Sequence, residues 1–283
     1  MMKHELGVNM GAFCSDKPET TMEQLKETAL VCRDSGFRYL DFETNYKRDD
    51  FEDRAKTFRA FLDESGMSVI QSHAPYNRYE TYPDAEFPML QDRCLTVASI
   101  LGAQYLVVHG DEFMPELGAQ FDSKKALDVY YDRFAPLVER AKKLGVGIAF
   151  ENLFEDGFKG RKRFCSTVEE LKSLIERYND PAVTCCWDFG HGRCSFGFDG
   201  CADALRQMGN LVTCTHVHDN RGEDEHLLPF LGRMNWADQI HALRDTGYQG
   251  YFTYEFVYLK FPRALHASFL SHAHDVGEYI LGL

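Results

Sequence analysis

Short apolar segments alternate with amphipathic segments along the whole chain. Eight apolar runs, each short as buried parallel strands are, cover residues 6–10, 39–43, 68–74, 105–109, 147–152, 183–188, 211–218 and 250–256. The segments between them place apolar residues at helical spacing and cover 21–34, 50–64, 88–101, 124–143, 168–178, 201–208, 236–246 and 264–281. The pattern predicts eight strand–helix units.

The predicted helices carry start and stop signals. Thr20 is the expected N-cap of the first helix, and Glu23 stands at the spacing of a capping box. Gly36 is the expected C-terminal stop of that helix. Four later helices end at a glycine just before the next strand: Gly66, Gly102, Gly145 and Gly247. This helix–glycine–strand rhythm is typical of a repeated βα unit.

Eight such units in 283 residues predict a single (β/α)8 TIM barrel spanning 1–283. A doubly wound open sheet is the alternative. That fold usually carries a glycine-rich nucleotide loop after its first strand, and the segment GAFCSDKPET has no GxGxxG pattern. No linker or change in composition divides the chain.

Composition narrows the class of protein. Hydrophobic residues make up 44% of the chain and charged residues 27%, and no run of about 18 apolar residues predicts a membrane span. The first residues lack a signal-peptide pattern, so we expect a cytoplasmic protein. Nine cysteines without a CxxC pair favour reduced thiols. The net charge of −13 weighs against nucleic-acid binding and suits hard cations.

Ionisable side chains stand at the C-terminal ends of seven consecutive predicted strands. They are Glu43, His73, His109, Glu151, Asp188, His216 with His218, and Glu255; His191 follows just beyond Asp188. In a TIM barrel these ends build the active site. Unpaired ionisable groups inside a barrel are costly, and a bound cation offsets that cost.

Four of these residues are the expected metal ligands, one on each of strands 5 to 8: Glu151, Asp188, His216 and Glu255. Adjacent strands lie roughly 4.8 Å apart, so four such side chains can converge on one ion. Three carboxylates and one imidazole favour Mn²⁺, with Mg²⁺, Co²⁺ or Zn²⁺ as alternatives. Cys186 and Cys214 lie two residues deeper and are expected to fill the core.

The motifs around these residues resemble those of the xylose-isomerase-like sugar isomerase/epimerase superfamily. They are SHAPY (72–76), VVHG (107–110), FENL (150–153), WDFGH (187–191), THVHDN (215–220), GRMNW (232–236) and YEF (254–256). The superfamily includes ketose 3-epimerases, inosose-processing enzymes and endonuclease IV-type enzymes. The resemblance covers nearly the whole chain and implies the same four metal ligands.

The resemblance also implies roles for neighbouring residues. An H-x-x-D pattern favours His216 as the strand-7 ligand, and an H-x-H pattern would favour His218. His191 and Arg221 are expected to contact substrate. Arg221 stands one position off the spacing usual in epimerases. Further substrate contacts are expected from three residues at the barrel mouth: Glu43, His73 and His109.

The implied chemistry is proton abstraction next to a carbonyl, through an enediolate stabilised by the metal. Glu151 and Glu255 come from strands 5 and 8 and would take and return the proton on opposite faces of the substrate. Return to the same carbon is epimerisation, and return to the neighbouring carbon is isomerisation. Loss of a β-hydroxyl would instead make the enzyme an inosose-type dehydratase. The absence of a phosphate cradle after strands 7 and 8 favours an unphosphorylated sugar or cyclitol, and the family often forms homo-oligomers.

An endonuclease IV-like phosphodiesterase with several zinc ions is the main rival. Four residues match the additional metal positions of that branch: His73, His109, Asp224 and His226. No basic DNA-contacting loop is recognisable, so the isomerase is preferred. A barrel that binds sugar without catalysis is a second rival, which the complete ligand set disfavours.

Overall fold

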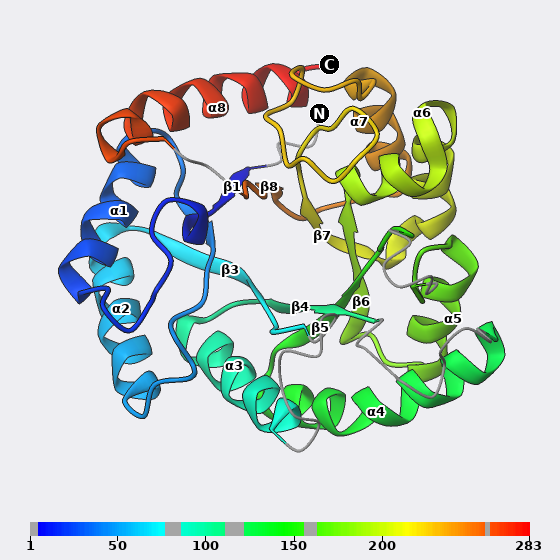
Figure 1. The fold of residues 1–283 in the computed structure, drawn as a ribbon, viewed down its shortest axis with the longest axis horizontal. Helices are drawn as coiled ribbons and strands as arrows, with labels where there is room; N and C mark the ends of the chain where they lie inside the picture. The colour runs from blue at the N-terminus through cyan, green and yellow to red at the C-terminus, as the bar shows by residue number, and fades with distance from the viewer. Residues whose placement is uncertain (1–4, 77–85, 111–121, 156–162, 258–260) are drawn as a thin grey trace.

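The strands form one parallel sheet that curves into a barrel (Figure 1). The structure is a computed structural model and describes residues 5–76, 86–110, 122–155, 163–257 and 261–283. The strands are β1 (Leu6–Asn9), β2 (Tyr39–Asp41), β3 (Ser68–His73), β4 (Tyr105–His109), β5 (Gly147–Glu151), β6 (Val183–Asp188), β7 (Val212–His216) and β8 (Phe252–Tyr254). Their order is β7-β6-β5-β4-β3-β2-β1-β8. The predicted TIM barrel is confirmed.

In the described residues, eight helices surround the strands (Figure 1). They are α1 (Met22–Asp34), α2 (Phe51–Ser65), α3 (Phe87–Leu101), α4 (Ser123–Leu144), α5 (Val168–Tyr178), α6 (Phe189–Met208), α7 (Trp236–Asp245) and α8 (His266–Leu281). Short 3-10 turns occupy Met10–Ala12, Gly209–Leu211 and Arg263–Leu265. The core packs between these helices and the strands because the apolar side of each element faces the other.

The two edge strands of the sheet, β7 and β8, meet along a short stretch of contacts, which we call the seam. Across it, the Val217 amide donates to the Thr253 carbonyl over 2.8 Å, and the Glu255 amide donates to the Val217 carbonyl over 3.1 Å. Val217 and Tyr254 form an isolated parallel bridge there. The barrel is therefore nearly closed, and its seam lies beside the last strand.

The helix signals are largely confirmed, with one correction. The N-cap of α1 is Thr21, whose hydroxyl accepts from the Gln24 amide while the Gln24 side chain accepts from the Thr21 amide. The predicted capping box of Thr20 and Glu23 is thus wrong by one residue. Gly66, Gly102 and Gly145 end their helices in the left-handed conformation that glycine adopts without strain.

Helix α6 begins much earlier than predicted. It starts directly after β6, where the Asp188 carboxylate caps it by accepting from the His191 amide over 2.6 Å. The predicted helix at 201–208 is only its second half, and the two halves meet at Gly197, which has φ 73°. Poor helix propensity of the glycines in the first half hid it from the sequence pattern. The early start fixes His191 one turn above Asp188.

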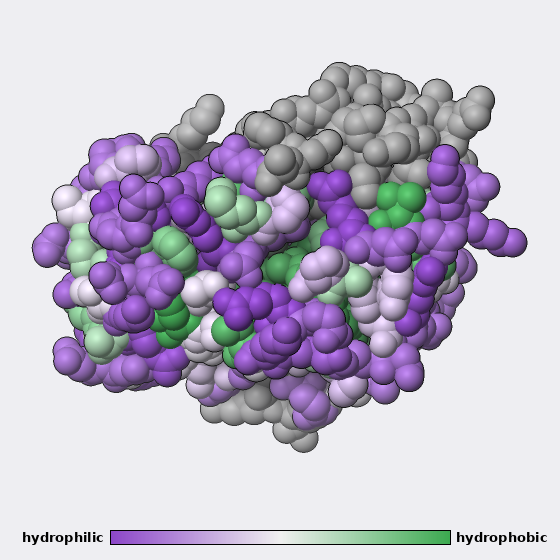
Figure 2. Space-filling view, turned by 90° about the horizontal axis from the view of Figure 1, so that it is seen from below, coloured by the Kyte–Doolittle hydropathy of each residue, from purple (hydrophilic) through white to green (hydrophobic). Residues whose placement is uncertain are grey.

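Cysteine and surface features follow the expectations in part. All nine cysteines are free, and Cys186 and Cys214 pack inside the barrel beside Val107 and Ala149. The face in Figure 2 is mainly hydrophilic, with scattered hydrophobic residues. Among the described residues, no helix is long and apolar enough to cross a membrane. The single domain, the cytoplasmic location and the homo-oligomer stay predictions.

Candidate metal centre

The four predicted ligands meet at the C-terminal mouth of the barrel. Glu151, Asp188 and His216 close β5, β6 and β7, and Glu255 follows β8 directly. The Nδ1 atom of His216 lies 3.5 Å from Glu151 Oε2, 3.6 Å from Glu255 Oε2 and 3.8 Å from Asp188 Oδ2. The side chains of Glu151, Asp188 and His216 are buried. Three carboxylates thus converge on one imidazole nitrogen.

This arrangement fits a divalent cation. Among the described residues, His216 Nδ1 is a buried nitrogen without a hydrogen-bond partner. Burial alone would raise the pKa of Glu151, but the imidazoles of His216 and His109 hold it well below its usual value. The pKa of His216 is in turn raised well above its usual value: the charges of Glu255 and Glu151 outweigh the lowering by burial. A cation would take the place of the protons that these pairs share without metal.

Asp41 is a member of the site that the sequence analysis missed. It is the last residue of β2, and its Oδ2 lies 3.2 Å from Nε2 of His216. The predicted strand 39–43 is two residues too long, so its expected last residue, Glu43, lies beyond the observed end of the strand at Asp41. Both residues lie on the same side of an extended segment, and the alternation alone could have indicated either.

Two further histidines lie close to the carboxylate of Glu151. Glu151 Oε2 lies 3.2 Å from Nε2 of His73 and 3.4 Å from Nε2 of His109. Burial lowers the pKa of His109 to about 4. For His73 the same burial is outweighed by the hydrogen bond and charge of Glu151, which raise its pKa to about 9. Both predicted residues therefore lie at the site, on the side of β3 and β4.

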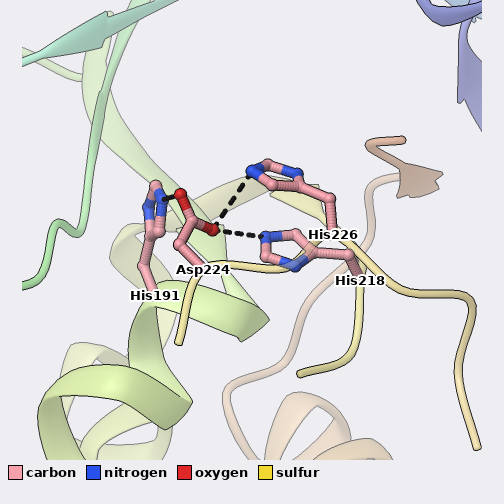
Figure 3. Close-up of side chains that lie close together, drawn as sticks. All are labelled: His191, His218, Asp224 and His226. Atoms are coloured by element: carbon pink, nitrogen blue, oxygen red, sulfur yellow. Dashed lines mark ion pairs between the residues drawn. The ribbon is translucent and has the colours of Figure 1, made fainter. Parts of the chain in front are cut away.

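Figure 3 shows a second group of donors at the barrel mouth. It consists of His191, His218, Asp224 and His226, whose ligand atoms lie within 4.8 Å of one another. Asp224 Oδ1 lies 3.1 Å from Nε2 of His226 and 3.9 Å from Nε2 of His218, and its Oδ2 lies 3.7 Å from Nε2 of His191. The sequence analysis grouped Asp224 and His226 with His73 and His109, whereas the structure places them with His191 and His218.

In the second group, the histidines and the Asp224 carboxylate shift one another's pKa values. His191 and His226 hold the pKa of Asp224 well below its usual value against the opposing effect of burial. The Asp224 carboxylate and the charge of Glu255 raise the pKa of His226 to about 9, although burial lowers it. The two groups touch, because His191 Nδ1 lies 3.0 Å from Glu151 Oε1 and His218 Nε2 lies 3.1 Å from Asp188.

A small hairpin after β7 brings Asp224 and His226 back over the barrel. Asp219 and Leu227 pair as an antiparallel bridge, with both backbone hydrogen bonds at 2.7–2.8 Å. The buried Asp219 carboxylate accepts hydrogen bonds from the amides of Asn220, Phe230 and Met234 and from the indole of Trp236. Asp219 therefore anchors the loop that carries half of the second group.

A cavity of about 570 Å³ opens next to the first group. Asp41, Glu43, His73 and Glu255 line its inner part, and polar loop residues after β1 and β2 line the rest. Burial raises the pKa of Glu43 to about 7, although the thiol of Cys94, 3.1 Å away, opposes the shift. Glu43 thus faces the cavity from the segment after β2.

Arg221 is the predicted site residue that the structure does not bring to the centre. Its guanidinium is exposed and contacts the Glu225 carboxylate at 2.9 Å and the Leu231 carbonyl at 3.2 Å. Its expected contact with substrate stays a prediction.

Comparison with known proteins agrees with this architecture. The family model of the xylose isomerase-like TIM barrel matches residues 30–268. The chain belongs to this family. A curated relative, the uncharacterized protein MJ1311 of Methanocaldococcus jannaschii, is 28% identical over 156 residues, which cover 55% of this chain and 51% of the relative. The chain therefore spans about half the length of the curated relatives it matches.

Solved structures similar to this family member include an epimerase, an AP endonuclease and a magnesium complex. D-psicose 3-epimerase with D-tagatose from Clostridium cellulolyticum H10 has 15% identity, a TM-score of 0.75 and coverage of 98% and 99% of the two chains. A family 2 AP endonuclease from Brucella melitensis has 15% identity, a TM-score of 0.70 and coverage of 95% and 99%. A xylose isomerase-like TIM barrel protein from Mycobacterium smegmatis in complex with magnesium has 17% identity, a TM-score of 0.70 and coverage of 99% and 98%. At these identities the likeness shows the shared fold.

Proposed function

We propose that the protein is an isomerase or epimerase that acts on a sugar or cyclitol and depends on a divalent metal. The main support is the pair Glu151 and Glu255. Their carboxylates come from β5 and from the end of β8, and both lie within 3.6 Å of His216 Nδ1. Glu255 also lines the cavity of about 570 Å³. Two carboxylates from different strands can serve opposite faces of one substrate.

The donor set supports Mn²⁺ first, and Mg²⁺, Co²⁺ or Zn²⁺ next, held by Glu151, Asp188, His216 and Glu255. Such an ion would polarise the substrate carbonyl. One of the two glutamates would remove the proton from the adjacent carbon, and the other would return it. His73 and Glu43 line the cavity and would hold substrate hydroxyls, and His191 and His109 would support Glu151.

Exchange of substrate hydrogen with solvent tests this proposal. The full chain is loaded with each of the four metals and incubated in D₂O with a panel of ketoses, aldoses and inososes, and deuterium incorporation is followed by NMR. We expect incorporation next to a carbonyl, and a loss of about 100-fold or more in Glu255→Gln. Asp275→Asn, at an exposed position of α8, is the matched control and should keep the wild-type rate.

The outcomes of this experiment are distinct. A product that keeps the elemental composition of the substrate, apart from the incorporated deuterium, and has an inverted centre or a shifted carbonyl supports the isomerase or epimerase. Loss of a hydroxyl group would instead assign the protein as an inosose-type dehydratase. A metal-loaded protein that exchanges no hydrogen of any compound would contradict the proposal.

The second donor group favours one other function, a phosphodiesterase with several zinc ions. His191, Asp224 and His226 could hold one ion, and His73 and His109 could hold another with Glu151. Metal analysis by mass spectrometry separates the two functions. One ion per chain is expected for the isomerase, whereas three zinc ions together with cleavage of abasic DNA would replace our preferred function.

A further inference from the structure

The imidazole of His216 has a polar contact on the side that faces away from the candidate ligands. Its Nδ1 faces the three carboxylates, and its Nε2 lies 3.2 Å from Asp41 Oδ2. β2, which ends at Asp41, does not pair with β7, which ends at His216. The contact therefore crosses the interior of the barrel and is independent of the strand ladder.

Gln71 of β3 holds Asp41 in place. The Gln71 side-chain amide donates to Asp41 Oδ2 over 3.0 Å and lies 3.4 Å from the Thr215 carbonyl. Thr215 directly precedes His216 on β7. The side chains of Gln71 and His216 are buried, and that of Asp41 is buried where it borders the cavity, so loss of one partner would leave a buried polar group unpaired.

The direction of these hydrogen bonds determines which nitrogen of the His216 ring carries the hydrogen. An ionised carboxylate only accepts hydrogen bonds, so Nε2 of His216 is the donor and carries the hydrogen. The lone pair of a neutral ring is then on Nδ1, where the three carboxylates converge. The neighbouring His218 differs in its partner: its Nε2 lies 3.1 Å from Asp188, which is itself a candidate ligand, whereas Asp41 is not one.

We propose that Asp41 and Gln71 are positioning residues of the metal centre, which fix the ring orientation of His216 and keep its Nδ1 free for the ion. This inference rests on the proposed dependence on metal. A carboxylate behind a histidine ligand fixes the tautomer and increases the basicity of the ligand, and its loss typically lowers metal affinity about 10–100-fold. The convergence of Glu151, Asp188 and Glu255 on its Nδ1 also favours His216 over His218 as the strand-7 ligand.

Binding of Co²⁺ to the chelator-stripped full chain tests the inference without any substrate. We expect Asp41→Ala to raise the Kd for Co²⁺ about 10–100-fold and to change the visible absorption of the bound ion. Asp41→Asn retains an acceptor oxygen and should recover part of the affinity. Gln71→Leu should weaken binding about fivefold, as expected for one hydrogen bond. Gln91→Leu, a buried glutamine of α3, is the matched control and should bind as the wild type does.

Unchanged affinity and spectrum in a folded Asp41→Ala protein would overturn the inference. If that variant does not fold, as judged by thermal unfolding with chelator present, Asp41→Asn and Gln71→Leu decide, and wild-type affinity in both would overturn it. A wild-type chain that binds no divalent metal would reject the proposed function, and the positioning role with it. The two failures are therefore distinguished by the wild-type titration.

Discussion

Replacing Asp219 by alanine should be among the most damaging single substitutions in this chain. The carboxylate is fully buried and accepts four hydrogen bonds: 2.8 Å from the Asn220 amide, and 3.0 Å each from the Phe230 amide, the Met234 amide and the Trp236 indole. Three of these donors belong to buried residues. An unsatisfied buried donor costs about 1–3 kcal/mol, so the three buried donors together predict that Asp219→Ala lowers the free energy of unfolding by at least about 3 kcal/mol.

Urea unfolding followed by far-UV circular dichroism, with chelator present, measures this loss. Asp219→Asn has nearly the same shape but turns an amide nitrogen toward N–H donors, so it should still cost about 2–4 kcal/mol. Asp275→Ala, exposed on α8, is the control and should stay within about 0.5 kcal/mol of the wild type. A loss below about 1 kcal/mol for Asp219→Ala would refute the view that this carboxylate anchors the loop after β7.

Three further predictions concern the site and its surroundings. Burial raises the folded-state pKa of Glu43 to about 7, so its contribution to stability is present below about pH 4.5 and lost as the pH rises through about 7. Glu43→Gln should therefore gain stability relative to the wild type by about 2–3 kcal/mol between pH 5 and 8, and a difference independent of pH in urea titrations would contradict this. Gly190→Ala should displace His218, because an ideal Cβ would lie 1.8 Å from His218 Cε1. The unfolding temperature of Gly190→Ala should fall by several degrees. Gly145 is exposed and has open space around it, so Gly145→Ala should lower the unfolding temperature less, through the strain of a left-handed backbone alone. Addition of Mn²⁺ at about 100 times its Kd should stabilise the chain by about 2.7 kcal/mol, and calorimetry that finds no rise with any of the four metals would count against a metal centre.

The sequence predicted the barrel and most of the residues that the structure brings together at its mouth. Buried parallel strands appear as short apolar runs, and the residues at their C-terminal ends form the barrel mouth. This is why Glu151, Asp188, His216 and Glu255 could be predicted together. None of the four predictions required knowledge of a contact between distant side chains.

The missed features all depend on distances across the fold. β2 is only three residues long and its register with β3 shifts between Leu40 and Asp41, so the alternation could not separate Asp41 from Glu43. The partnership of Asp41 with His216 spans 175 residues. His218 lies near Asp224 and His226 only because the loop after β7 folds back as a hairpin. The acidic sequence of that loop does not indicate a hairpin.

The seam between β7 and β8 has a consequence for synthesis of the protein. β8 pairs with β1, so while the ribosome has not yet made Phe252–Tyr254, the sheet has two free edges, and such edges invite pairing with other chains. A truncation before β8 is therefore expected to aggregate. His216 and Glu255 flank this seam from its two sides. An ion bound by both would be acquired only by a finished chain and would lock the last strand into the barrel, so metal loading would report completed folding.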